Sequence, residues 1–154
     1  MDMAGRGRNC SAAVKRIARS AIVQRSAETV YALVEDIESY PSFLPRCLAA
    51  EVRERSPGRT VAALTFGFPG LRQSFTTENS NHPGRAIDLR LLEGPFRRFT
   101  AAWRFTPLGA EAAKIEFSMA YEFANPLLAK ALSPLFENLA DSMVKAFRLR
   151  AEKA

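Results

Sequence analysis

Apolar residues recur at three- and four-residue steps between residues 125 and 151, which is the spacing of one face of a helix. Asn125 suits the N-cap, because its side chain can accept hydrogen bonds from free amides of the first turn, and Pro126 suits the next position. Pro134 lies inside the pattern, so a kink or a short break is expected there. The predicted apolar face of this long C-terminal helix consists of Leu128, Leu132, Leu135, Phe136, Leu139, Met143 and Phe147.

The chain before this helix has a period of two. Apolar and polar residues alternate between Cys47 and Phe123, as in strands that bury one face. Short turn signals such as Ser56-Pro57-Gly58 separate the strands and imply antiparallel pairing. The predicted strands are residues 14–24, 48–55, 59–68, 71–79, 86–92, 96–106 and 114–123, with turns at 81–84 and 107–109.

Two short helical segments follow the first strand. Ser26 can cap a helix that ends near Ile37, and Pro41 and Pro45 bracket a compact turn or second short helix. The order of elements predicts an α+β fold of the helix-grip type, in which a curved antiparallel sheet of six or seven strands surrounds the C-terminal helix. Residues 14–154 are expected to form a single domain, and residues 1–13 a disordered basic tail.

The net charge of +6 is unevenly distributed. Residues 1–25 hold six Lys and Arg residues against one acid, whereas the remainder holds 16 basic and 15 acidic residues. A basic nucleic-acid-binding face on the body of the protein is therefore not supported by bulk charge, and no DNA partner is expected. A local basic patch stays open, and Arg90, Arg97, Arg98 and Arg104 are candidate phosphate or ribosome contacts, although exposed strand arginines also serve solubility.

The inner faces of the predicted strands carry large aromatic and aliphatic side chains. They form a core in one interpretation, and in the other they line a cavity that suits an apolar ring or a lipid chain. Gln73, Thr77 and Asn79 share the face of Phe75. These polar groups either orient a ligand carbonyl or lie at a solvated rim. The candidate pocket residues are Phe43, Leu44, Gln73, Phe75, Thr77, Leu89, Leu91, Trp103, Phe105, Phe117, Tyr121, Leu135, Leu139 and Met143.

Catalytic candidates are few. His82 is the sole histidine and lies in a predicted turn, so a serine–histidine triad has no other candidate base. No Gly-rich phosphate loop follows a strand, and no Cys/His cluster has the spacing of a zinc site. No catalytic residue, no metal ligand and no required cofactor are therefore predicted.

Several stretches together resemble the bacterial RatA and coenzyme-Q-binding START-type family, within the wider polyketide-cyclase and lipid-transfer superfamily. The resemblance covers about residues 16–152, and Arg46 departs from it, because the family often has Trp at that position. The stretches are DIESYPSFLP (36–45) with Cys47, RQSFTT (72–77) with Asn79, EGPFR (93–97), WRFTPLG (103–109), and SMV (142–144) with Ala146 and Phe147.

The resemblance implies a helix-grip fold and an apolar pocket that binds ubiquinone or a similar isoprenoid lipid. The first hypothesis is therefore a carrier without catalysis that supports respiratory electron transfer, in the cytoplasm or peripherally at the inner membrane. The family also contains a ribosome-association toxin that binds the large ribosomal subunit and inhibits translation, and this is the alternative. A cyclase-like enzyme is a third hypothesis, which the superfamily permits and these residues do not support.

Overall fold

The structure is a computed structural model, and it describes residues 14–153. The tail predicted at residues 1–13 lies outside the described residues. Seven strands form one antiparallel sheet: β1 (Lys15–Val23), β2 (Cys47–Ser56), β3 (Arg59–Phe68), β4 (Leu71–His82), β5 (Ala86–Glu93), β6 (Phe96–Gly109) and β7 (Ala112–Phe123). The helices are α2 (Ala27–Glu35), the 3-10 helix η1 (Ile37–Ser42) and α3 (Pro126–Lys153).

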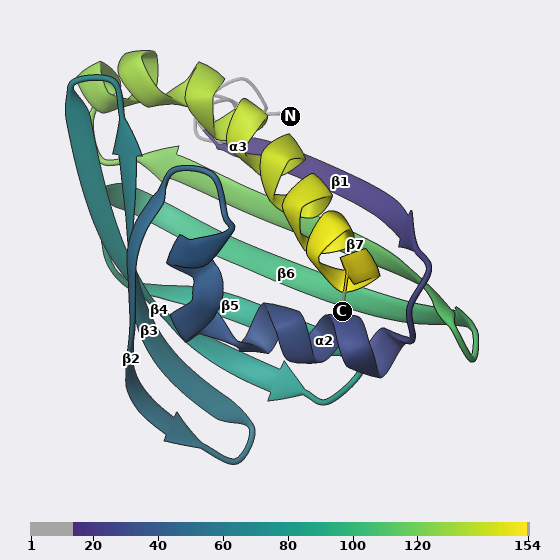
Figure 1. Cartoon of the computed structure of the whole chain (residues 1–154). Helices are drawn as coiled ribbons and strands as arrows, with labels where there is room; N and C mark the ends of the chain where they lie inside the picture. The colour runs from purple at the N-terminus through teal and green to yellow at the C-terminus, as the bar shows by residue number, and fades with distance from the viewer. Residues whose placement is uncertain (1–13, 154) are drawn as a thin grey trace, which may run out of the picture.

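The strand order is β1-β7-β6-β5-β4-β3-β2. The chain crosses from β1 to the opposite edge through α2 and η1, and it then runs back strand by strand until β7 pairs with β1. The sheet curves around α3, which lies along β1 and β7, while α2 lies beside the C-terminal end of α3 (Figure 1). This arrangement confirms the predicted helix-grip fold. Within residues 14–153, none of the helices combines the length and the apolar character that crossing a bilayer requires.

The predicted helix ends are supported by side-chain caps. Ser26 Oγ accepts a hydrogen bond from the amide of Thr29 at 3.2 Å, and Asn125 Oδ1 accepts one from the amide of Leu128 at 2.9 Å. Each cap satisfies a donor that the first helical turn leaves without an intrahelical partner. The two caps fix where α2 and α3 begin.

A kink or a short break was expected at Pro134, and the prediction of a break is wrong. α3 is continuous from Pro126 to Lys153. The missing amide of Pro134 would have bonded the carbonyl of Lys130, four residues earlier. Lys130 is exposed, so water can satisfy that carbonyl without interrupting the helix.

The turn predicted at residues 107–109 is also wrong. β6 continues to Gly109, which pairs with Ala112, so the chain reverses at residues 110–111. A register shift between Pro107 and Gly109 accommodates the proline, because a bulged position does not need to donate to the ladder. Similarly, β4 extends to His82, and the following turn reaches a left-handed conformation at Gly84, with φ of 74°.

Candidate functional site

The space between α3 and the concave face of the sheet is filled by aromatic rings. All eleven Phe, three Tyr and one Trp of the chain lie in the described part and make ring contacts. They form two groups that do not touch each other through rings among the described residues. The first aromatic cluster consists of Phe66, Phe68, Phe75, Phe96, Phe99, Tyr121, Phe123 and Phe136. The second aromatic cluster consists of Tyr31, Tyr40, Phe43, Trp103, Phe105, Phe117 and Phe147.

Each cluster contains one ring from α3. Phe136 contacts the first cluster, with its centroid 5.2 Å from that of Tyr121. Phe147 lies three turns later and contacts the second cluster, with its centroid 5.2 Å from those of both Trp103 and Phe43. The helix is therefore attached to the sheet at two separate aromatic contacts.

A row of residues without aromatic rings crosses the sheet between the two clusters. Its members are register partners on successive strands, and they are Thr60, Asn79, Leu89, Ala101, Met119 and Ile17. Thr77, one pleat along β4 from Asn79, is buried as well. Among the members of this row, Ala101 is small and Met119 is unbranched and flexible. If an apolar ligand enters the fold, these side chains can give way more easily than the rings on either side.

The row and its neighbour Thr77 contain three of the buried polar side chains of the sheet, Thr60, Thr77 and Asn79, and Thr76 is buried as well. The Thr77 hydroxyl donates to Asn79 Oδ1 at 2.7 Å, and Asn81 Nδ2 donates to Thr60 Oγ1 at 2.9 Å. In the Thr77–Asn79 hydrogen bond, the amide of Asn79 accepts through its oxygen. Its NH₂ group does not take part in this bond and is the group of the pair that can donate to another acceptor. Thr77 and Asn79 are 3% and 5% exposed, so they lie inside the fold and not at a solvated rim.

The structure distributes the predicted pocket residues over several environments. Phe105, Trp103, Phe117 and Phe43 belong to the second aromatic cluster, whereas Phe75 and Tyr121 belong to the first. Leu139 is buried on α3. The other apolar candidates, which lie in or against the core, are buried Leu44 and half-buried Leu89, Leu91, Leu135 and Met143. Gln73 is half-buried and is the register partner of Phe66. Their role in ligand binding stays a prediction.

Tyr121 has an unusual environment. Its side chain is fully buried, and its hydroxyl has no hydrogen-bond partner among the described residues. Burial, and secondarily the negative charge of Glu137, raise the pKa of Tyr121 to about 12. Tyr121 also lines a cavity of about 230 Å³ with Lys15 and Arg97 at the N-terminal end of α3.

The four candidate arginines all lie near carboxylates on exposed parts of the sheet. Arg104 is 2.9 Å from a carboxylate oxygen of Asp88, and Arg97 and Arg98 lie 3.9 and 3.7 Å from Glu122. Arg90 is ion-paired with Glu78. Phosphate recognition by these side chains would first require separating them from their carboxylates.

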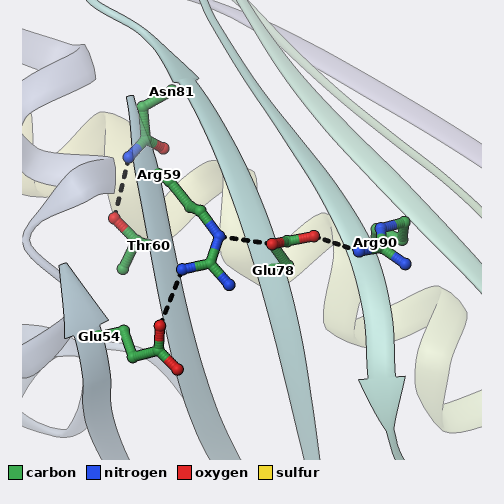
Figure 2. Close-up of polar contacts among 6 residues, drawn as sticks. All are labelled: Glu54, Arg59, Thr60, Glu78, Asn81 and Arg90. Atoms are coloured by element: carbon green, nitrogen blue, oxygen red, sulfur yellow. Dashed lines mark hydrogen bonds and ion pairs between the residues drawn. The ribbon is translucent and has the colours of Figure 1, made fainter. Parts of the chain in front are cut away.

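Glu78 is the centre of a charged network on the sheet. Figure 2 shows Arg59 between Glu54 and Glu78, with Arg90 on the far side of Glu78. Hydrogen bonds from Arg59 and then from Arg90 lower the pKa of Glu78 below its ordinary value. The same figure shows the hydrogen bond from Asn81 of β4 to Thr60 of β3.

The motif at residues 36–45 contains η1, and Tyr40 of this motif packs η1 against α2 and α3. The hydroxyl of Tyr40 donates to the carbonyl of Val34 in α2, and the ring of Tyr40 contacts Phe147 of α3 at 5.4 Å. Burial raises the pKa of Tyr40 far above its ordinary value. Arg46 adopts a left-handed conformation with φ of 67°, and its guanidinium lies 5.5 Å from the centre of the Phe68 ring. An arginine therefore covers this aromatic ring.

Other chemistry is limited. His82 is exposed and lies 3.5 Å from Asp88. In residues 14–153, no three His, Cys, Asp or Glu side chains gather closely enough to hold a metal ion.

The profile of the family described as polyketide cyclase / dehydrase and lipid transport matches residues 23–148. The chain belongs to this family. It is 41% identical over 138 residues to the protein named ribosome association toxin RatA of Escherichia coli (strain K12), covering 90% of this chain and 87% of that protein. It is 29% identical over 143 residues to coenzyme Q-binding protein COQ10 homolog B, mitochondrial, of Xenopus laevis, covering 89% of this chain and 59% of that one.

A solved structure supports the same fold. The Zhui aromatase/cyclase from Streptomyces sp. R1128 superimposes with a TM-score of 0.82, covering 91% of this chain and 94% of that chain. The two sequences are 20% identical, so this likeness concerns the fold alone. Family membership thus accounts for the helix-grip architecture and leaves the activity to be argued from the residues.

The structure also reveals a feature that sequence reasoning missed. Phe43 and Arg150 are in contact, with the Arg150 guanidinium carbon 4.7 Å from the ring centre. The sequence suggested only that basic residues near the end of α3 oppose the helix dipole. The sequence did contain a signal for a basic surface on this part of the helix. Lys145, Leu149 and Lys153 are spaced by four residues, which places two cations and a leucine on one strip of the helix.

Proposed function

We propose that this chain associates with the ribosome and acts by binding, without catalysis of its own. The observation that carries the proposal is 41% identity to a protein named as a ribosome association toxin, spread over 90% of this chain. The likeness to an aromatase/cyclase carries less weight, because one fold hosts many unrelated activities. The expected site of action is the cytoplasm, and the expected target is the large ribosomal subunit.

Sedimentation with separated ribosomal subunits tests this proposal. The purified protein is mixed with 50S or 30S particles, and bound protein is measured after centrifugation through sucrose. We expect migration with 50S and reduced formation of 70S particles when both subunits are combined. The 30S particle is the matched control, because it also presents RNA phosphates. Absence of binding, or equal binding to both particles over a range of salt concentrations, contradicts the proposal.

A second candidate function is binding of ubiquinone or a related isoprenoid. It is favoured by the aromatic-free row and its Thr77–Asn79 pair, which place a polar group inside an apolar interior. The relative named as a coenzyme Q-binding protein points to the same ligand class. In this proposal the ligand enters between the two aromatic clusters, and the protein contacts the inner membrane peripherally to exchange it in support of respiratory electron transfer.

Quinones of increasing tail length test the second candidate. Each buried methylene contributes about 0.8 kcal/mol before the cost of ordering the chain, so longer tails should bind more tightly. Trp103 reports binding through fluorescence quenching, because its indole lies in the second aromatic cluster. Phe117→Ala should weaken binding of a long-tail quinone more than binding of the headgroup alone. Gln73→Leu should do the reverse if Gln73 hydrogen-bonds a quinone carbonyl. Equal affinity for all tails, or no saturable quenching, contradicts a carrier role.

A further inference from the structure

A groove of about 570 Å³ runs between the C-terminal half of α3 and the chain that leaves η1. On the helix side it is lined by Lys145, Leu149, Arg150 and Lys153, and on the other side by Phe43 together with neighbouring small residues. Leu149 is 43% exposed, which leaves an apolar surface between the cations. The groove therefore combines positive charge with an apolar floor on the outside of the molecule.

The charge of this groove is not compensated. None of the residues that line it is acidic. In the described part of the chain, neither Lys145, Arg150 nor Lys153 lies within ion-pairing distance of a carboxylate. The arginines on the sheet differ, because Arg90 and Arg104 are each paired with an acid. A polyanion can thus bind in the groove without displacing a carboxylate.

Arg150 is held in place before any ligand arrives. Its guanidinium lies over the Phe43 ring, and Phe43 is itself fixed by edge contacts with Tyr40 and Phe147. A cation positioned over an aromatic face loses less side-chain freedom when it binds phosphate, and the planar guanidinium offers several donors. This contact therefore prepares one strong phosphate donor inside the groove.

The helix dipole does not account for the whole pattern. Cations near a helix C-terminus oppose its partial negative charge, but this effect is confined to the last turn. Arg150 and Lys153 fall there, whereas Lys145 lies two turns before the end of α3. Lys145 nevertheless lines the groove together with Leu149 and Lys153. What Lys145, Arg150 and Lys153 share is therefore the groove that they line, and not a place in the last helical turn.

We propose that this groove binds the phosphate backbone of single-stranded RNA, as in an exposed segment of ribosomal RNA. The inference rests on the ribosome association proposed above and assigns its contact surface. Proteins that track single strands combine a basic groove with aromatic and apolar surface, which is the composition found here. A lipid surface is less suited to this site, because membrane-bound helices insert protruding apolar residues, and this surface is concave.

The test compares two variants that lose the same charge. The groove variant carries Lys145→Gln, Arg150→Gln and Lys153→Gln. The control variant carries Arg72→Gln, Arg85→Gln and Lys130→Gln, which removes three exposed cations that also lack a carboxylate partner in the described residues. Binding to a fluorescent 20-nucleotide single-stranded RNA, to 50S particles, and to phosphatidylglycerol vesicles is measured for both variants and the wild type. Thermal melting followed by circular dichroism shows that each variant is folded.

We expect the groove variant to bind RNA and 50S particles about tenfold more weakly than the control variant. Its salt slope should fall by about 2, because each phosphate contact with a single strand contributes about 0.7 to that slope. If the wild type binds 50S and both variants bind equally well, the groove proposal is wrong and ribosome association stands. If RNA binding depends on the groove but 50S is not bound, the groove proposal stands and the proposed function fails. No RNA binding by the wild type, or a loss confined to vesicles, overturns the groove proposal.

Discussion

The ring of Phe147 lies edge-on to the indole of Trp103, with the ring centroids 5.2 Å apart and the planes at 81°. This contact joins the C-terminal half of α3 to β6. Phe136, in the N-terminal half of the helix, contacts Phe96 and Tyr121 and makes no ring contact with the indole. Phe136 and Phe147 therefore each pack α3 against the sheet, but in separate aromatic clusters. Substituting them one at a time tests whether the two clusters are independent.

Phe147→Ala and Phe136→Ala should each destabilise the protein by about 3–5 kcal/mol, because each removes a buried ring from a packed interior. Of these two variants, only Phe147→Ala should alter the emission spectrum of Trp103, because Phe147 contacts the indole and Phe136 does not. Urea unfolding gives the free energies, and tryptophan fluorescence of the native variants gives the second readout. A spectral change of similar size in Phe136→Ala would show that the two clusters are not separate.

Leu139 should be essential for the attachment of α3 to the sheet. Its side chain is 4% exposed between the two aromatic contacts, so Leu139→Ala should cost about 2–5 kcal/mol. Leu127→Ala on the same helix is the matched control, because Leu127 is 80% exposed and should change stability by less than about 0.5 kcal/mol. Denaturant unfolding of both variants decides the matter, and a loss below about 0.5 kcal/mol for Leu139→Ala would mean that the helix packs differently.

The sheet and helix could be predicted from sequence because their patterns admit one arrangement. Phe99, Trp103 and Phe105 alternate with polar residues on β6, and a sheet that buries one face must place them together. A shift by one residue would expose all three rings to water. The extension of β6 past Pro107 could not be predicted, because a bulge interrupts the ladder there and sequence alone does not show which strand position is left unpaired.

The charge environment of the strand arginines needed the structure. Arg90 faces Glu78 and Arg98 faces Glu122 only because of the strand register, which brings together residues 12 and 24 positions apart. The contact between Phe43 and Arg150 likewise joins two segments that are far apart in the sequence. Alternation identifies which residues point inward, whereas pairing between distant segments determines which charges remain free for a partner.

Glu78→Gln should weaken the network on the sheet in a pH-dependent way. Hydrogen bonds from Arg59 and Arg90 lower the pKa of Glu78, so the folded state favours its ionised form. The resulting stabilisation is present above the ordinary carboxyl pKa of 4.5 and is lost as the pH falls through the lower, folded-state pKa. The variant should thus be less stable than the wild type at pH 7, and the difference should shrink in strong acid and at 1 M salt.

Glu111→Gln is the control for this experiment, because Glu111 is exposed and makes no ion pair within the described residues. Urea unfolding at pH 7 and pH 3 measures all three proteins. If Glu78→Gln and Glu111→Gln are equally stable at pH 7, the network contributes nothing measurable, as is common for exposed pairs.

Tyr121→Phe should stabilise the protein at neutral pH. The hydroxyl of Tyr121 is buried and has no hydrogen-bond partner among the described residues, so its removal relieves a desolvated polar group. The expected gain in unfolding free energy is about 1 kcal/mol, the usual cost of such a group. A loss of more than about 1 kcal/mol would instead reveal a partner for the hydroxyl, such as a bound molecule in the adjoining cavity of about 230 Å³.

The same substitution should change the alkaline limit of stability. The pKa of Tyr121 is raised from 10.0 to about 12, first by burial and then by Glu137, so the folded state holds the phenolic proton more tightly than the unfolded chain. The stabilisation that comes from this difference in pKa is therefore complete below pH 10, and it is lost as the pH rises towards 12. Wild type should lose more stability than Tyr121→Phe over this interval, and since Tyr40 also has a raised pKa and is present in both proteins, the difference between their unfolding curves isolates Tyr121.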